Sequence, residues 1–271
     1  AAAVRIKNSI NLQALSQTNG YGQTPTQFQR STYPAWAQEK ISLLREGVNL
    51  DLCKPEPQAR KRNLVINGVK IGPRDALITY LARNLEPYRG FHSVMRALPR
   101  ILAERKDAHI IMVGGDQVSY GAPPPGRGSW REILLKELEG QLDLSRIHFV
   151  GKVAYDDFRA LLKRSDAHLY LTYPFVASWS LREAMATGCP IVGSDTAPVS
   201  EFITDGLTGR LVPFLEPDRI ADVVLELLED RKQARRLGQD ARRYAEAELC
   251  LQGYLKRYDA LVQEIVSGHP R

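Results

Sequence analysis

The chain has 271 residues, of which 44% are hydrophobic and 25% are charged, the composition of a globular protein long enough to bury a sizeable core. No apolar run approaches the roughly 20 residues that span a bilayer, and residues 1–17 lack the apolar core of a signal peptide. The net charge of +6 fits either a solvated basic surface or an anionic partner, such as a phosphorylated ligand or an acidic membrane face. No run of lysine and arginine with interleaved aromatic residues indicates nucleic acid.

The three cysteines are Cys53, Cys189 and Cys250. They are odd in number, far apart and without the spacing of metal ligands. The sequence therefore predicts reduced thiols and a cytoplasmic protein.

The first 38 residues differ from the rest of the chain. Residues 5–17 predict a helix, and the following segment is rich in Gly, Pro, Thr and Gln without core periodicity. In TPTQFQRS (24–31) a strand end turns into a short helix, with Thr24 or Thr26 as its cap. These elements cannot enclose a core, so we expect them to be the last part of a domain whose front is absent.

From residue 40 onward the elements become regular. Asn67-Gly68 in NLVINGVKI marks a hairpin, and the run 76–83 predicts a buried strand. Helical and strand patterns then alternate. The expected order is a helix from 91, a strand at 109–115, a helix from 129, a strand from 146, a helix from 155, a strand from 167, a helix near 181, strands from 191 and 209, a helical stretch from 218 and a last helix from 250.

This alternation predicts βαβ units and an α/β fold: a doubly wound, Rossmann-like parallel sheet with helices on both faces. In such sheets ligands bind at the carboxyl ends of the strands, near the point where the strand order reverses. Candidate site residues are therefore those that directly follow the strands.

Arg83 and Arg89 follow the first core strand in ARNLEPYRG (82–90). Two guanidinium groups at a strand end suit a diphosphate, because each presents a planar fork of hydrogen-bond donors. In a transfer reaction they would also stabilise the negative charge on a leaving phosphate. The alternative from spacing alone is a pair of surface arginines.

Gly114 and Gly115 end the second core strand, where the absence of a Cβ lets a backbone approach a ligand closely. The alternative is a tight turn only. No G-x-G-x-x-G fingerprint accompanies them, so a dinucleotide site is not indicated.

Ser178, Trp179 and Ser180 lead into a helix expected to begin near Leu181, with Glu183 in its first turn. The unpaired N–H groups of a helix start suit a phosphate. A carboxylate there is stabilised by the helix dipole and can also accept hydrogen bonds from a ribose diol. The alternative is that Glu183 only matches the charge of the helix end.

Several stretches together resemble the C-terminal, sugar-donor-binding domain of the retaining family 4 (group 1) glycosyltransferases of the GT-B type. They are EGV (46–48), ARNLEPYRG, IIMVGGD, IHFVGKV, EAMATGCPIVGSDTAPVSEFI and DGLTGRLV, in the family's order and spacing. TPTQFQRSTYP resembles the end of that family's N-terminal domain. The long final helix resembles the one that crosses back to that domain.

The resemblance implies a role for each matching residue. Arg83 matches the arginine on the diphosphate of the sugar donor, and Arg89 stands where the family usually has a lysine. Gly114 and Gly115 match glycines near the sugar donor, and Lys152 and Val153 match the segment beside the base. Ser178 to Ser180, with Trp179 between them, match the loop at the phosphates. Glu183 matches the acid at the ribose. Glu183 is the second acid of the family's E-x7-E motif.

Phe175 departs from that motif, because the first acid of E-x7-E falls at this position. In the family that acid contacts the transferred sugar, and phenylalanine cannot accept a hydroxyl hydrogen bond. YPFVASWSLREAMA resembles a variant of the motif in some bacterial members. We therefore favour altered sugar recognition over loss of activity.

The resemblance implies a metal-independent glycosyltransferase with no cofactor, which moves a sugar from a nucleotide-diphosphate-sugar to a glycan, lipid or other acceptor with retention, as in polysaccharide or glycoconjugate biosynthesis. We expect an incomplete enzyme: 1–38 as a remnant of the acceptor domain, 39–252 as the domain that binds the sugar donor, and 253–271 as the helix that crosses back. The basic charge would suit peripheral contact with the cytoplasmic membrane face.

Two alternatives stay open. The first is a nucleotide-sugar-binding module without transfer activity, which Phe175 permits. The second is a sugar-nucleotide epimerase or a phosphorylase-like enzyme on the same fold, although no lysine motif for pyridoxal phosphate is evident.

Overall fold

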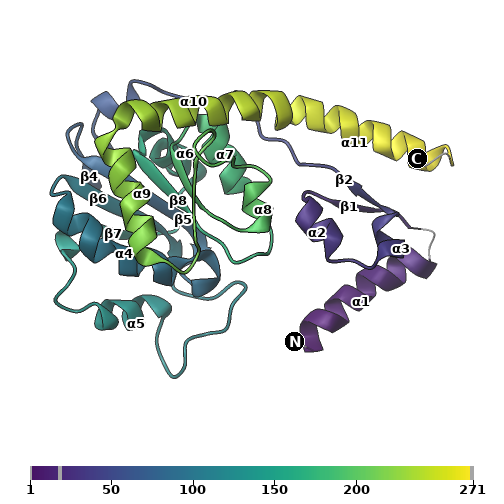
Figure 1. The fold of residues 1–271 in the computed structure, drawn as a ribbon, viewed down its shortest axis with the longest axis horizontal. Coiled ribbons are helices and arrows are strands. Elements are labelled where there is room, and N and C mark those ends of the chain that lie inside the picture. The colour runs from purple at the N-terminus through teal and green to yellow at the C-terminus, as the bar shows by residue number, and fades with distance from the viewer. Residues whose placement is uncertain (1, 18–19, 269–271) are drawn as a thin grey trace.

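Six parallel strands form the centre of the fold in the computed structural model, which describes residues 2–17 and 20–268 (Figure 1). They lie in the order β10-β9-β8-β5-β6-β7. Their bounds are β5 (Ala76–Asn84), β6 (Ala108–Gly115), β7 (Ile147–Gly151), β8 (Ala167–Tyr170), β9 (Ile191–Ser194) and β10 (Arg210–Val212). The chain moves outward from β5 in one direction and then from β8 in the other, which is the Rossmann order. The predicted doubly wound, Rossmann-like sheet is confirmed.

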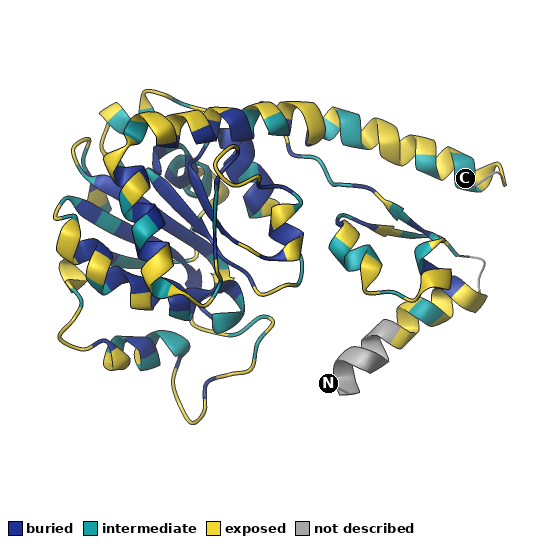
Figure 2. Cartoon of the chain, viewed as in Figure 1, coloured by how far each residue is buried: buried dark blue, intermediate teal, exposed yellow. Residues whose placement is uncertain are grey.

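Strand β5 shows why this sheet must be covered on both faces. Ala76, Ile78 and Tyr80 are buried in one apolar cluster, and Leu77 and Leu81 are buried in the other. A strand that is apolar on both sides is typical of a parallel sheet between two helical layers. Figure 2 shows these strands buried between helices with exposed outer faces.

The helices divide between the two faces. The cluster on one face includes α4 (Phe91–Glu104), α5 (Trp130–Glu137) and α9 (Pro217–Glu229). The cluster on the other includes α6 (Tyr155–Arg164) and α7 (Trp179–Thr187), with the short α8 (Ala197–Ser200) beside it. Helix α10 (Arg231–Glu248) contributes residues to both.

The predicted helical stretch from 218 is two helices, α9 and α10. Asp230 separates them, and its carboxylate accepts hydrogen bonds from the backbone N–H groups of Lys232 and Gln233. An aspartate cap of this kind begins a new helix, so the chain changes direction there.

The predicted hairpin is confirmed. Strands β3 (Leu64–Ile66) and β4 (Val69–Ile71) are antiparallel, and both turn residues have positive φ, 45° for Asn67 and 83° for Gly68. The Asn67 side chain donates a hydrogen bond to the Val150 carbonyl at 2.9 Å, which fixes the hairpin tip to the end of β7.

A small N-terminal unit lies beside the sheet domain (Figure 1). It consists of α1 (Ala2–Gln17), β1 (Gly22–Thr24), α2 (Gln27–Ser31), α3 (Ala35–Gln38) and β2 (Ile41–Leu43), and β1 pairs in parallel with β2. This pairing brings the residues up to Leu43 into contact with the unit. Thr26 caps α2 by accepting a hydrogen bond from the Gln29 N–H, so the second of the two predicted caps is the one used.

The connections between the two parts lie together. The Val48 N–H donates to the Leu249 carbonyl at 2.7 Å, and the Leu251 N–H donates to the Val48 carbonyl at 3.1 Å. Helix α11 (Leu251–Val266) leaves the sheet domain from this point and runs above the N-terminal unit in Figure 1. A second contact joins the parts: the Glu201 carboxylate accepts the N–H groups of Gln27 and Phe28 at 2.8 and 2.7 Å.

Within residues 2–17 and 20–268, no helix has the length and apolar character needed to cross a membrane. The three cysteines are free thiols, and Cys53 and Cys189 are buried.

Candidate functional site

A cavity with a volume of about 750 Å³, the main cavity, lies at the carboxyl ends of the central strands. It is centred on β5 and β8, the neighbouring strands between which the strand order reverses. The lining residues come mainly from strand ends, from the loop before α7 and its first turn, from the segment that follows β2, and from the N-terminal unit. They are Pro25, Gln29, Glu46, Tyr80, Leu81, Ala82, Arg83, Arg89, Val113, Tyr120, Phe158, Leu169, Tyr170, Leu171, Val176, Ala177, Ser178, Trp179 and Ser180.

Arg83 and Arg89 both line this cavity, although they differ in environment. Arg83 is exposed, whereas Arg89 is 8% exposed and sits at the end of a short 3-10 turn, Pro87–Arg89. Gly90 follows with φ 77°, and a Cβ there would lie 2.4 Å from the Leu171 Cβ, so only glycine fits. The turn therefore directs the Arg89 side chain back toward the end of β8.

The Arg89 guanidinium is held by neutral groups. Its Nη1 donates to the Thr172 hydroxyl at 2.9 Å and to the Val176 carbonyl at 3.2 Å. Its Cζ lies 5.0 Å from the ring centre of Tyr120 and 5.7 Å from that of Phe175. No carboxylate among the described residues forms an ion pair with it. A buried cation held in this way keeps its positive charge available to an anion in the cavity.

Four aromatic rings gather beside Arg89, and the sequence did not predict this. The ring centres of Tyr88 and Tyr173 are 5.2 Å apart, and those of Tyr120 and Phe175 are 5.1 Å apart. Tyr88 also meets Phe175 edge-on at 5.5 Å. Phe175 is thus part of an aromatic cluster at the position where the family motif has an acid.

Glu86 is a second residue that the sequence did not indicate. Its side chain is fully buried, and its carboxylate accepts the backbone N–H groups of Ser119, Tyr120 and Gly121, the shortest at 2.8 Å. It therefore fixes the loop that places Tyr120 over Arg89. The only signal in the sequence is an acid just before Pro87, which does not identify partners more than 30 residues away.

Helix α7 begins at Trp179 with Ser178 as its cap residue, two positions earlier than expected. The Ser178 N–H donates to the Tyr170 hydroxyl at 2.7 Å, and this bond from the end of β8 sets where the helix starts. The N–H groups of its first turn have no acceptor within the helix, and Ser178, Trp179 and Ser180 line the cavity. The predicted helix start at the cavity is therefore present.

The expected position of Glu183 in the first turn is wrong, because the earlier start makes it the fifth residue of α7. The helix dipole falls off within the first turn, so dipole matching no longer accounts for this acid. Its carboxylate accepts a hydrogen bond from the Tyr155 hydroxyl at 2.7 Å, and burial raises the pKa of Glu183 above its ordinary value.

Glu183 lines a smaller neighbouring cavity of about 170 Å³. Trp179 lines both cavities, and its side chain is 69% exposed with Nε1 donating to Glu46 at 3.1 Å. Glu183 thus does not line the main cavity, and Trp179 is the residue that the two cavities share.

Gly114, Gly115, Lys152 and Val153 are not among the residues that line the main cavity. A Cβ on Gly115 would lie 2.6 Å from Oδ1 of Asn84, and one on Gly114 would lie 3.0 Å from the Ala82 carbonyl. Close packing between β5 and β6 thus accounts for both glycines. Lys152 is exposed at the end of β7.

In the part of the chain that the structure describes, no group of three His, Cys, Asp or Glu side chains could hold a metal ion. Asp156 and Asp157 lie in the first turn of α6.

Two family models match the chain. Residues 66–244 match "Glycosyl transferases group 1", and residues 1–53 match "Glycosyl transferase family 4 group". The first match contains every strand of the central sheet. It also contains helix α7, whose residues line both cavities.

Curated relatives include a D-inositol 3-phosphate glycosyltransferase of Streptomyces avermitilis, 26% identical over 76% of this chain and 43% of the relative. A GDP-mannose-dependent alpha-(1-6)-phosphatidylinositol monomannoside mannosyltransferase of Mycobacterium tuberculosis is 27% identical over 77% of this chain and 52% of the relative. The chain thus spans about half the length of the curated relatives it matches.

Among solved structures, Anabaena HepE in complex with UDP-glucose has a TM-score of 0.72 at 17% identity, covering 90% of this chain and 64% of that one. The C-terminal domain of LpcC, a glycosyl transferase group 1 family protein from Francisella tularensis, has a TM-score of 0.63 at 16% identity, covering 76% of this chain and all of that domain. These likenesses show the fold. Since the first family model covers well over half of the chain, this protein belongs to the glycosyl transferases group 1 and has the fold of the C-terminal domain of GT-B glycosyltransferases.

Proposed function

We propose that this chain forms the sugar-donor side of a retaining glycosyltransferase that moves a sugar from a nucleotide-diphosphate-sugar to a glycan or lipid acceptor. The observation that carries this proposal is the convergence of Arg83, Arg89 and the start of α7 on one cavity at the reversal point of the sheet. Two guanidinium groups and a set of helix N–H groups are the chemistry that binds a diphosphate.

These groups would also assist the reaction. When the bond between the anomeric carbon and the diphosphate oxygen breaks, negative charge develops on the leaving phosphate. Arg89 is held in place before the reaction by Thr172 and Val176, so little reorganisation is needed to stabilise that charge. Arg83, which is exposed at the same cavity, would approach the diphosphate from the open side.

Glu183 is proposed to hold the ribose. One of its oxygens accepts the Tyr155 hydroxyl, and a carboxylate retains further acceptor positions for a vicinal diol. The small cavity beside it is continuous in its lining with the main cavity through Trp179. The base would then lie toward Lys152 and Val153, with Gly114 and Gly115 near the sugar donor, as the family resemblance implies.

Glu183→Gln is expected to weaken binding of a ribonucleotide more than binding of its 2′-deoxy analogue. Glutamine keeps the size of the side chain but loses the charge, so the diol loses a charge-assisted hydrogen bond. The measurement is the ratio of the two affinities in wild type and variant by calorimetry, with melting temperature as a control. An unchanged ratio beside a lowered melting temperature would assign Glu183 a structural role only.

The transferred sugar is proposed to rest against aromatic rings instead of an acid. Tyr88, Tyr120, Tyr173 and Phe175 form one cluster next to Arg89. An aromatic face packs well against the C–H groups of a sugar ring, whereas Phe175 offers no acceptor for sugar hydroxyls. This favours altered sugar recognition over loss of activity.

The acceptor is proposed to approach from the side of the N-terminal unit, because Pro25 and Gln29 line that wall of the cavity. One relative is named for a phosphatidylinositol monomannoside, which favours a lipid among the acceptors considered. A lipid acceptor would place the protein at the cytoplasmic face of a membrane, peripherally bound.

Nucleoside diphosphate binding is expected to proceed without metal, because arginines and helix N–H groups supply the positive field. UDP and GDP are each titrated by calorimetry, once with EDTA and once with Mg²⁺ or Mn²⁺. For each nucleotide, the dissociation constants with and without metal should agree within about threefold, which corresponds to a free-energy difference of about 0.6 kcal/mol. Binding only in the presence of the metal would contradict the proposed site.

A nucleotide-sugar-binding module without transfer activity is the second candidate, and Phe175 is the observation that favours it. A thermal-shift panel of nucleoside diphosphates and nucleotide-sugars tests binding in both cases, since a ligand of the folded state raises its apparent stability. Sugar transfer by this domain joined to a complete acceptor domain distinguishes them: release of the nucleoside diphosphate with sugar on the acceptor supports the enzyme.

A further inference from the structure

A second large cavity lies at the amino ends of the strands, opposite the main cavity. Its volume is about 540 Å³, and it includes Asp166 and Pro190, which directly precede β8 and β9, together with one side of α10. Its walls carry seven cationic and two anionic side chains: Arg60, Lys163, Arg164, Arg231, Arg235, Arg242 and Arg243 against Glu56 and Asp166. The amino ends of the strands are far from the carboxyl ends that form the main cavity, which is proposed above to bind the sugar donor. This is therefore a separate site.

Three of these cations have carboxylate partners of their own. Lys163 pairs with Glu56 at 3.1 Å, Arg242 pairs with Glu246 at 2.7 Å, and Arg243 pairs with Asp240. Arg242 also donates to the carbonyls of Cys53 and Ala186, which makes it a structural link between α10 and the chain around it.

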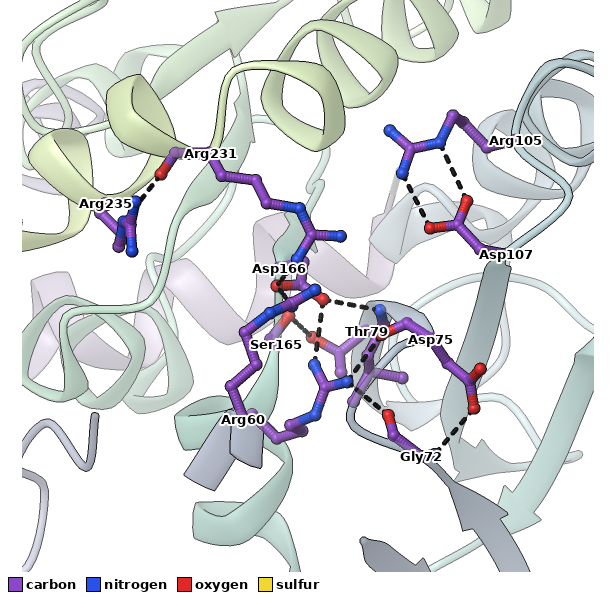
Figure 3. A network of polar contacts seen from close by, with 12 residues as sticks. Arg60, Gly72, Asp75, Thr79, Arg105, Asp107, Ser165, Asp166, Arg231 and Arg235 are labelled. Carbon is purple, nitrogen blue, oxygen red and sulfur yellow. Dashed lines mark hydrogen bonds and ion pairs between the residues drawn. The ribbon is translucent and has the colours of Figure 1, made fainter. Parts of the chain in front are cut away.

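Of the other four cations, three share one carboxylate and the fourth has none. Arg60 and Arg164 contact Asp166 directly, Arg164 at 3.0 Å, and Arg231 lies 3.9 Å from it. Arg235 donates only to the Arg231 carbonyl, at 3.1 Å, among the contacts of the described residues. Four positive charges therefore face one negative charge, and Figure 3 shows the guanidinium groups of Arg60 and Arg231 directed toward Asp166.

The anionic partner of this cluster is already occupied by the fold. Asp166 Oδ2 accepts the Leu77 N–H at 2.9 Å as well as the Arg164 bond. Arg164 has no exposed side-chain surface, its Nη2 donates to the carbonyls of Gly72 and Asp75, and its Nε has no hydrogen-bond partner. Burial, and then the charge of Arg235, lower the pKa of Arg231. The positive charge of the cavity is thus fixed in place and under-compensated.

We propose that this cavity binds a phosphate group carrying two or more negative charges. Arg60, Arg231 and Arg235 are the partly exposed guanidinium groups around it, and such forks bind phosphate oxygens bidentately. The cavity also has apolar walls, formed by Pro55, Pro57, Pro190 and Leu227, against which a carbon body attached to the phosphate packs. That body belongs to either a free phosphorylated molecule or the headgroup region of a phospholipid. This proposal does not depend on the activity proposed above.

The test titrates inorganic pyrophosphate into the whole chain by calorimetry, using the wild type and four variants. Arg231→Gln and Arg235→Gln are expected to weaken one binding event at least tenfold, the loss typical of a charge-assisted hydrogen bond. Arg236→Gln is the matched control, because Arg236 is the neighbour on α10, has a side chain 80% exposed, pairs with Asp240 at 3.9 Å and does not line the cavity. It removes the same charge and should change the affinity less than twofold.

Arg83→Ala separates this event from binding at the sugar-donor cavity, because it should leave the event intact. Equal losses in Arg235→Gln and Arg236→Gln would overturn the proposal, since they would indicate diffuse surface charge. Absence of any binding event sensitive to Arg231 and Arg235 would overturn it as well.

A vesicle arm distinguishes the two sources of phosphate. Sedimentation with phosphatidylcholine vesicles containing phosphatidic acid, lost in Arg235→Gln but not in Arg236→Gln, supports a lipid headgroup. Pyrophosphate binding that depends on Arg235, without vesicle binding that does, supports a free phosphorylated molecule.

Discussion

Replacing Arg83 with alanine is expected to weaken nucleoside diphosphate binding by about 10- to 100-fold. A hydrogen bond to a charged group typically contributes roughly 1.5–3 kcal/mol, which corresponds to that range of affinity. Arg83 lines the main cavity and is exposed, and no ion pair ties it to another described residue. The fold should therefore tolerate the change, so that the loss reports on the diphosphate contact alone.

Arg127→Ala is the matched control for this experiment. Arg127 is also exposed and lies between β6 and α5, in the same connection as Tyr120, yet it does not line the cavity. Its replacement removes the same charge and should change the affinity by no more than about twofold, which is roughly 0.4 kcal/mol. Equal effects of the two variants in calorimetry would count against the proposed clamp.

Glu86→Ala is expected to lower the free energy of unfolding by about 3 kcal/mol. The variant leaves three backbone N–H groups without their acceptor, and an unsatisfied buried polar group typically costs about 1–3 kcal/mol. Relaxation of the loop toward water recovers part of the total. The same relaxation frees Tyr120 from its place over Arg89, so binding of a nucleotide-sugar should weaken too.

The measurement is urea unfolding of both proteins, with Glu104→Ala as the comparison. Glu104 is half-exposed on α4 and pairs with Arg100 four residues earlier, at 2.8 Å. Such a surface pair contributes little, so its loss should stay within about 0.5 kcal/mol. Similar destabilisation by the two variants would mean that Glu86 does not hold the loop.

The fold could be predicted because its strands are apolar on both sides and its turns carry specific residues. Asn67-Gly68 predicts a hairpin from two neighbouring residues. The apolar run 76–83 predicts a buried central strand from its composition alone. Both signals are local, and local signals survive folding when the tertiary structure agrees with them.

The start of α7 could not be predicted to the residue, because Ser178 and Ser180 are both suitable caps. The Tyr170 hydroxyl decides between them by binding the Ser178 N–H, and this contact from β8 exists only after the sheet has formed. The error moved Glu183 by half a turn and removed the dipole argument for it.

Glu86 and the cavity around Asp166 were not predicted for a related reason. The partners of Glu86 lie in a loop after the next strand, and those of Asp166 come from both earlier and later segments of the chain. In the sequence, each arginine around Asp166 taken alone indicates only a surface charge. The guanidinium groups of these arginines come together only when the sheet has folded, at the amino ends of its strands.

The hydrogen bonds that join Val48 to Leu249 and Leu251 have a mechanical consequence. The two connections between the parts are held to each other there, so they can move apart only by breaking these bonds. A Cβ on Gly47 would come within 2.5 Å of the Leu251 Cα, so a larger residue would push the two connections apart. The Glu201 contact with α2 joins the parts at a second place. Since Pro25 and Gln29 of the N-terminal unit line the main cavity, the width of that cavity depends on contacts that none of its own lining side chains needs to make.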